Sequence, residues 1–345
     1  MRERRELARP EVADGRNIDE TLGELRGEGA LQQVNRLDET RPFERKPWRS
    51  EATADEDSYF GLPLLKTSVW KWPIPAYFYA GGLAGASAAL GAAAALLGRR
   101  RLRRISRASR RIAAAGAVVS AGLLIQDLGV RRRFIYMLRV FRPTSPMNLG
   151  TWLLSGFGAC ATAALLPGRV GDAAAAASGV LGLPLTSYTG VLLANTAVPF
   201  WQAARTTLPP VFVASAAASA ASAFEMMRLG RRERRVIRRM AIAGKLAELL
   251  NDFALERELA RVEQVALPLH QGASGLLWNC AKACKAMSLM LSIVRRKPRW
   301  ARIAGGMLGT LGALATRFAI FEGGKASARD PQATFALQRA DPAHA

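Results

Sequence analysis

Long apolar runs alternate with short polar segments along most of this chain. The first run extends from Ile74 to Leu97 and contains no charged residue. A helix rises 1.5 Å per residue, so a run of this length can cross a hydrocarbon layer about 30 Å thick. Several similar runs follow. The pattern therefore predicts an all-α, polytopic transmembrane helix bundle.

We expect about eight helices to cross the membrane. Thr144 or Ser145 before Pro146 suits the start of the third helix, since proline is tolerated in a first turn. The sixth helix carries one apolar and one charged stripe. It either crosses with the polar stripe inside the bundle or lies along the interface, and crossing is the favoured interpretation. The expected crossings are roughly 74–97, 111–129, 149–166, 173–198, 209–227, 239–262, 271–294 and 301–320.

The chain is expected to have three parts. Residues 1–58 are polar, with fifteen acidic residues against eleven basic, and contain no apolar stretch of signal length. This composition predicts a tail that is disordered or binds a partner, and the first spanning helix would then act as the targeting signal. The helix bundle occupies residues 59–325, and residues 326–345 form a C-terminal tail.

Arginine clusters give the chain its formal net charge of +22. In a soluble protein such a charge would indicate a nucleic-acid partner, but here the clusters separate apolar runs. Clusters of this kind set orientation by the positive-inside rule and attract anionic lipid. The connections after the first, third, fifth and seventh spans hold most of these charges. We therefore expect a bacterial plasma-membrane protein with both termini outside and no nucleic-acid partner.

The chain has few residues that could hold a redox cofactor. Its three cysteines are Cys160, Cys280 and Cys284, whereas an iron–sulfur cluster needs about four thiolates at motif spacing. Its two histidines are His270 and His344, and the second is in the tail. We expect no haem, no iron–sulfur cluster and no metal site in this chain.

The connection between the second and third spans is basic although it is expected outside. Phe134, Leu138 and Phe141 share one face of a short helix, which is typical of a helix lying along the bilayer surface. The segment is either a simple amphipathic connector or a lid over a site that also docks an acidic partner. The arginines of the predicted docking surface are Arg133, Arg139 and Arg142.

Four polar residues are candidates for ligand binding. Asp127 ends the second run, and an acid within the membrane suggests proton or ligand handling. Tyr77 lies in the first run and Tyr188 in the fourth, with Asn195 two turns beyond it. A phenol can hydrogen-bond a ligand carbonyl while its ring packs against an apolar headgroup. Each tyrosine could equally be an ordinary packing residue.

Acidic residues in the fifth and sixth spans suggest a weak proton path. Its candidates are Glu225, Glu248 and Asp252. The alternatives are solvated surface charge, or pairing with Lys245, Lys282 and Lys285. Arg317 and Glu322 are expected at the outer end of the last span.

Several segments resemble the NrfD family, the membrane subunit of polysulfide reductase and related complexes. The resemblance covers about residues 59–331 and rests on Trp70–Pro75, Asp127–Gly129, Met137–Met147, Tyr188–Leu193 and Arg317–Glu322. It implies an eight-helix bundle that has no redox cofactor of its own. It also implies menaquinone or another quinone bound near the outer surface, close to Tyr77, Asp127 and Tyr188.

The same resemblance implies partners. An iron–sulfur subunit would dock outside and connect the chain to a molybdopterin catalytic subunit, as in polysulfide-reductase-like or formate-dehydrogenase-like complexes. This chain would then be a non-catalytic or quinone-reactive subunit. It has Tyr77 and Tyr79 where well-understood members offer Asn and His to the quinone. A membrane tether without quinone turnover therefore stays open, as does a transporter with no redox role.

Overall fold

The computed structural model describes residues 17–19, 24–26, 65–128, 134–295 and 297–340. The chain divides into two compact units, Met1–Thr53 and Ala54–Ala345. In the first unit, strand β1 (Asn17–Asp19) pairs antiparallel with strand β2 (Glu24–Arg26). Most of the polar tail expected at 1–58 lies outside the described residues.

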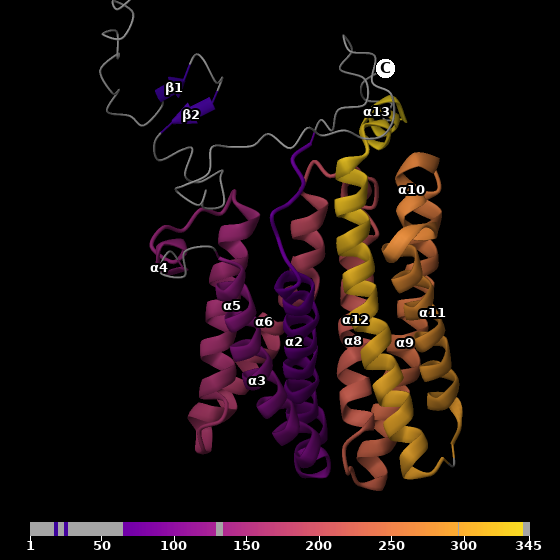
Figure 1. Cartoon of the computed structure of the whole chain (residues 1–345). Coiled ribbons are helices and arrows are strands. Elements are labelled where there is room, and N and C mark those ends of the chain that lie inside the picture. Colours follow the sequence, from indigo (N-terminus) through magenta and orange to yellow (C-terminus); the bar gives the residue numbers. More distant parts are fainter. Residues whose placement is uncertain (1–16, 20–23, 27–64, 129–133, 296, 341–345) are drawn as a thin grey trace, which may run out of the picture. The chain divides into compact units, whose positions relative to one another are not determined.

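The described part of the second unit is helical and contains eight helices of 18 residues or more. These helices run side by side in a bundle (Figure 1). They are α2 (Pro73–Gly98), α3 (Arg103–Asp127), α5 (Pro146–Ala163), α6 (Gly168–Ala194), α8 (Leu208–Glu225), α9 (Arg231–Leu259), α11 (Gly272–Ile293) and α12 (Arg299–Arg329). The predicted helical class is confirmed for this unit.

Four of these helices are long and apolar enough to cross a membrane: α2, α3, α6 and α12. The fold is therefore that of a helical membrane protein. That all eight long helices cross the membrane stays a prediction.

The two ends of the bundle differ. One end carries the short helices α4 (Phe134–Met137), α7 (Pro199–Ala203), α10 (Glu263–His270) and α13 (Pro331–Ala340), and we call it the short-helix end. The other end carries the 3-10 helix η1 (Arg99–Leu102) and the turns that follow α5, α8 and α11. We call it the arginine-rich end, because three arginine-rich stretches of the described chain, 101–111, 228–239 and 297–302, lie there (Figure 1).

Several helices begin earlier than the apolar pattern predicts. Helix α3 begins at Arg103 instead of residue 111, and α9 begins at Arg231 instead of residue 239. The prediction that these arginines fill connections was therefore wrong. Arginine favours helices about as well as leucine, and its long side chain can reach water from a helix end, so the helices continue through the clusters. Helix α5 begins at Pro146 with Ser145 as its N-cap, as predicted.

Small residues allow the helices to pack closely. A Cβ atom added at Gly85 of α2 would lie 2.5 Å from the carbonyl oxygen of Gly182 on α6. Packing of this kind holds helices together where no water-driven hydrophobic effect operates between them. Helices α2 and α6, which carry two of the candidate residues, are thereby held in direct contact.

An aromatic stack closes the short-helix end. Trp201 of α7 stacks between Trp70 and Phe321, with ring centroids 6.1 and 6.4 Å away. Its indole nitrogen donates a 2.9 Å hydrogen bond to the carbonyl oxygen of Ile320. Gly324 leaves room for the ring, because a Cβ atom there would lie 2.1 Å from it. The stack ties α7 and the segment before α2 to α12.

Helix α9 turns its polar stripe into the bundle. Lys245, Glu248 and Asp252 are each 1% exposed, and the helix packs against α8 and α11. The apolar stripe is on the outside instead, and its exposed members are Leu246, Leu250 and Phe253. The sequence left two arrangements open: a crossing helix with its polar stripe inside the bundle, or a helix along the interface. An inward polar stripe suits the first arrangement, in which the outer surface of the helix faces lipid. Whether α9 crosses stays a prediction.

Candidate functional site

All four residues predicted to bind a quinone lie toward the short-helix end; Asn195 caps α6 there, just before α7. Tyr77 is in the second turn of α2, Asp127 is the last residue of α3, and Tyr188 is near the end of α6. Helix α2 packs against both α3 and α6. An Asp127 carboxylate oxygen, Oδ1, accepts a 3.0 Å hydrogen bond from the backbone N–H of Lys71, just before α2. The fold thus gathers residues from the first, second and fourth predicted spans.

Tyr188 is fixed by the beginning of α5. Its hydroxyl donates a 2.6 Å hydrogen bond to the carbonyl oxygen of Pro146. Its ring lies against Gly150, where an added Cβ atom would come within 2.0 Å of the tyrosine hydroxyl oxygen. Only glycine leaves room for the phenol in this position. The hydroxyl hydrogen is already used, so toward a ligand this group could act only as an acceptor.

Tyr77 is buried but its hydroxyl has no partner. The residue is 3% exposed, and its ring lies beside that of Phe78, with ring centroids 5.7 Å apart. Within the described part of the chain, no hydrogen bond from the Tyr77 hydroxyl to another residue is found. The hydroxyl oxygen is not among the fully enclosed polar atoms that lack a partner, so it lies where water or a ligand can reach it and accept its hydrogen bond.

Asp127 and Asn195 differ in what they offer. The second carboxylate oxygen of Asp127 makes no hydrogen bond to the described residues, and the side chain is half-buried. Asn195 is exposed at the C-terminal cap of α6, and its amide nitrogen donates a 2.8 Å hydrogen bond to the Val191 carbonyl oxygen of its own helix. The structure joins Asp127 to the segment just before α2, whereas the Asn195 amide nitrogen is used within α6.

The predicted docking segment is a short helix followed by an exposed loop. Helix α4 covers only Phe134–Met137, so Phe141 lies beyond it, where its ring contacts Trp152 edge-on at 6.0 Å. Arg139 and Arg142 are exposed. Arg133 lies outside the described residues. Two of the three predicted docking arginines are therefore available at the surface of this loop.

Asn148 holds that loop in place, which sequence reasoning missed. Its amide nitrogen donates to the carbonyl oxygens of Met137 (3.0 Å) and Val140 (2.8 Å). Its amide oxygen accepts a 2.7 Å hydrogen bond from the backbone N–H of Arg142. An asparagine in the first turn of an otherwise apolar helix is the sequence signal that could have revealed this role.

The acids of the predicted proton path are paired with lysines deep in the bundle. Toward the arginine-rich end, Glu225 lies 2.5 Å from the Lys245 ammonium and 3.2 Å from the Lys297 ammonium. Farther along α9, Lys285 forms an ion pair with Asp252 and lies 3.8 Å from Glu248. The pairing that the sequence left open as an alternative is therefore present. Lys282 pairs with a different acid, Glu256, at 2.5 Å.

Arg317 is a further buried cation, in addition to Lys245 and Lys285, and it does not lie at the helix end. Helix α12 continues to Arg329, so Arg317 lies within the bundle and is 2% exposed. Its Nη2 donates a 3.0 Å hydrogen bond to the carbonyl oxygen of Phe212, and its guanidinium stacks 3.7 Å above the Phe212 ring. The expectation that Arg317 flanks the outer end of the last span was wrong. The apolar run ends there, but the helix does not.

Comparison with known protein families identifies the chain. A family model described as polysulfide reductase, of the NrfD type, matches residues 57–327. The chain belongs to this family. The match covers α2 to α11 and most of α12, and agrees with the resemblance seen at residues 59–331. No curated protein matches the chain. Membership of the NrfD family indicates a membrane anchor of an oxidoreductase complex.

The described residues of this NrfD-family protein contain no group of three His, Cys, Asp or Glu side chains that could hold a metal ion. The three cysteines are unpaired. The polar groups that stand out near the short-helix end are instead hydrogen-bonding groups: the unpaired Tyr77 hydroxyl, the free Asp127 oxygen and the acceptor side of Tyr188. Such a set suits a ligand with carbonyl or hydroxyl oxygens.

Proposed function

We propose that this chain is the membrane anchor subunit of a respiratory oxidoreductase. It would exchange electrons between menaquinone, or another quinone, and an iron–sulfur partner subunit that leads to a molybdopterin catalytic subunit. Membership of the NrfD family supports the anchor role. The observation that carries the quinone site is the Tyr77 hydroxyl, which makes no hydrogen bond to another described residue and is not fully enclosed by the protein.

Each residue of the proposed site has a distinct role. A bound quinone supplies two-electron, two-proton chemistry. Tyr77 donates a hydrogen bond to a quinone carbonyl, because its hydroxyl has no other acceptor. Tyr188, held by Pro146, accepts a hydrogen bond from the reduced form. Asp127 exchanges protons with water, since one carboxylate oxygen is free and the side chain lies at a helix end. Asn195 could donate a hydrogen bond to the quinone only after its amide nitrogen has released the Val191 carbonyl oxygen.

The partner would dock at the short-helix end. Exposed Arg139 and Arg142 suit an acidic surface on the iron–sulfur subunit, since complementary charge guides association. In this arrangement the short-helix end and both termini face outside, and all eight long helices, α9 included, cross the bacterial plasma membrane. The arginine-rich end then faces the cytoplasm, in agreement with the positive-inside rule.

The buried charges of α8 and α9 support the proposed proton path. Glu225 begins it at the arginine-rich end, and Glu248 and Asp252 continue it toward the interior. Glu248 Oε1 and Asp252 Oδ1 are buried without a hydrogen-bond partner among the described residues. Each could therefore accept a proton or bind a water molecule, while the lysines keep the neighbouring charges balanced.

The quinone site is tested in the assembled complex. We expect Tyr77→Phe, Tyr188→Phe and Asp127→Asn each to lower quinol-linked turnover at least about tenfold, because each removes a hydrogen bond or a proton-exchanging group. Assembly, and turnover with an artificial donor that bypasses the membrane, should not change. Tyr136→Phe, which removes the hydroxyl of an exposed tyrosine on α4, is the control. Normal quinol-linked turnover in all three site variants would contradict the proposal.

One observation favours a second function, a tether without quinone turnover. The Tyr188 hydroxyl already donates to Pro146, which leaves fewer donors for a quinone than the site would otherwise have. Menaquinone extracted from the purified complex distinguishes the two functions. About one quinone per chain, lost in Tyr77→Phe, supports turnover, whereas none in the wild type supports the tether. No observation favours a transporter.

A further inference from the structure

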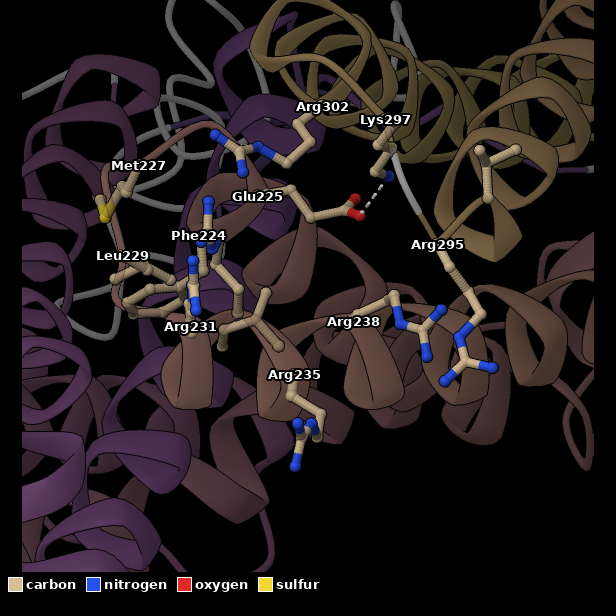
Figure 2. Close-up of a pocket in the computed structure, with 13 residues that line it drawn as sticks. Phe224, Glu225, Met227, Leu229, Arg231, Arg235, Arg238, Arg295, Lys297 and Arg302 are labelled. Atoms are coloured by element: carbon tan, nitrogen blue, oxygen red, sulfur yellow. Dashed lines mark hydrogen bonds and ion pairs between the residues drawn. The ribbon is translucent and has the colours of Figure 1, made fainter.

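A basic cavity of about 340 Å³ opens at the arginine-rich end. It lies between the turn after α8, the first turns of α9 and the connection from α11 to α12 (Figure 2). Six arginines and Lys297 line it, together with one carboxylate, Glu225. Its apolar lining comes from Phe224, Met227, Leu229, Ile237 and Val294. The cavity thus combines an apolar base with a strongly cationic rim.

The positive charge of the rim is not neutralised by the protein. Glu225 is already held by Lys245 and by Lys297, and Figure 2 shows the contact with Lys297. Among the described residues, no acidic group lies within ion-pair distance of the other cationic side chains of the rim, which include Arg234 and Arg302. Like charges gathered in a concave site repel one another and attract an anion. Arginine favours phosphate, since its planar fork can bind two oxygens at once.

The surroundings of the cavity favour a lipid over a soluble phosphate compound. Ile293 and Val294 at the end of α11 are 55% and 50% exposed, and Trp300 in the first turn of α12 is 71% exposed. Tryptophan typically lies at the level of the lipid headgroups. Acyl chains could therefore follow this exposed apolar surface while their phosphate enters the rim. A volume near the lower end of known ligand pockets suits a headgroup and its glycerol.

We propose that this cavity binds the phosphate headgroup of an anionic phospholipid. Arg234 from α9 and Arg302 from α12 would hold the phosphate oxygens, and the headgroup would link the ends of α8, α9, α11 and α12. The site is separate from the proposed quinone site, which lies toward the opposite end of the bundle. The proposal also differs from the general attraction of arginines for anionic lipid. It requires particular residues around one cavity, so removing arginines elsewhere should not weaken binding.

The test uses the full-length purified protein in detergent, titrated with phosphatidylglycerol or phosphatidylcholine. Lipid retention by native mass spectrometry and the midpoint of thermal unfolding are the two readouts. We expect the wild type to prefer phosphatidylglycerol, and Arg234→Gln/Arg302→Gln to bind it at least about tenfold more weakly. The matched control is Arg232→Gln/Arg239→Gln, which removes the same charge from α9 outside the cavity. It should change binding by less than about twofold.

Three results would overturn the proposal. Equal weakening in both double variants would show non-specific attraction by net charge. Equal retention of the two lipids by the wild type would show that the net negative charge of the lipid is not recognised, since both headgroups carry a phosphate. Inorganic phosphate at millimolar concentration that reproduces the full thermal shift, while phosphatidylglycerol gives none, would identify a soluble phosphate as the ligand. Phosphatidylglycerol that binds tightly in the presence of that phosphate supports the lipid.

Discussion

Replacing Lys285 with methionine tests the buried charge cluster of α9 and α11. The lysine side chain is fully buried and pairs with Asp252, whose side chain is 2% exposed, while Glu248 lies 3.8 Å away. Lys285→Met keeps most of the volume but leaves two buried carboxylates without their cation. Breaking a buried ion pair by removing one partner costs about 3–5 kcal/mol. We expect a loss of stability in this range.

The chain contains a matched control one turn away on the same two helices. Lys282 pairs with Glu256 at 2.5 Å, but these side chains are 37% and 25% exposed. An exposed ion pair contributes about 0–1 kcal/mol, so Lys282→Met, which breaks a partly exposed pair, should cost far less than Lys285→Met. The difference of about 3 kcal/mol corresponds to more than a hundredfold change in the unfolding equilibrium.

The assay is equilibrium unfolding of the purified protein in detergent, followed by helix content. The double variant Lys285→Met/Asp252→Asn should recover at least half of the loss, because it removes the charge that lost its partner. If Lys285→Met costs no more than Lys282→Met, or if the double variant is less stable than the single one, the assignment of these charges to a dry interior is wrong.

Three further substitutions test local packing. Gly150→Ala should displace the Tyr188 phenol, since the added Cβ would lie 2.0 Å from the tyrosine oxygen. Quinol-linked turnover should then fall about as much as in Tyr188→Phe. Unchanged turnover would contradict this. Asn148→Ala should speed proteolysis of the loop after α4, because it removes the side chain that accepts from Arg142 and donates to two carbonyls, with no change in circular dichroism. Gly324→Ala should cost about 1–3 kcal/mol by pressing on Trp201, and an unchanged melting temperature would argue against the tight contact.

The sequence predicts the helical class well because each long apolar run demands a helix in lipid. It predicts helix ends less well. Apolar patterns report where the hydrocarbon layer should end, but a helix can continue through arginines into the headgroup region. This is why α3 and α9 begin eight residues before the predicted spans, at Arg103 and Arg231, and why Arg317 lies inside the bundle.

Long-range contacts explain the other differences. The polar stripe of α9 faces inward because Asp252 pairs with Lys285, which is 33 residues away in the sequence. A local sequence pattern spans too few residues to predict this contact. The role of Asn148 depends on how the preceding loop folds back onto it, because its partner Arg142 is six residues earlier in the sequence. The candidate residues Tyr77, Asp127 and Tyr188 could be named from the sequence, yet the free hydroxyl of Tyr77 appears only in the fold.

Photolabelling with an azido-quinone tests the central claim most directly. The purified complex is irradiated with the probe, digested, and analysed by mass spectrometry, with menaquinone as competitor. The account predicts label near the short-helix end, on peptides that contain Tyr77 or Tyr188, which excess menaquinone suppresses. Label that menaquinone does not suppress, or label confined to the arginine-rich end, would contradict a quinone site between α2, α3 and α6.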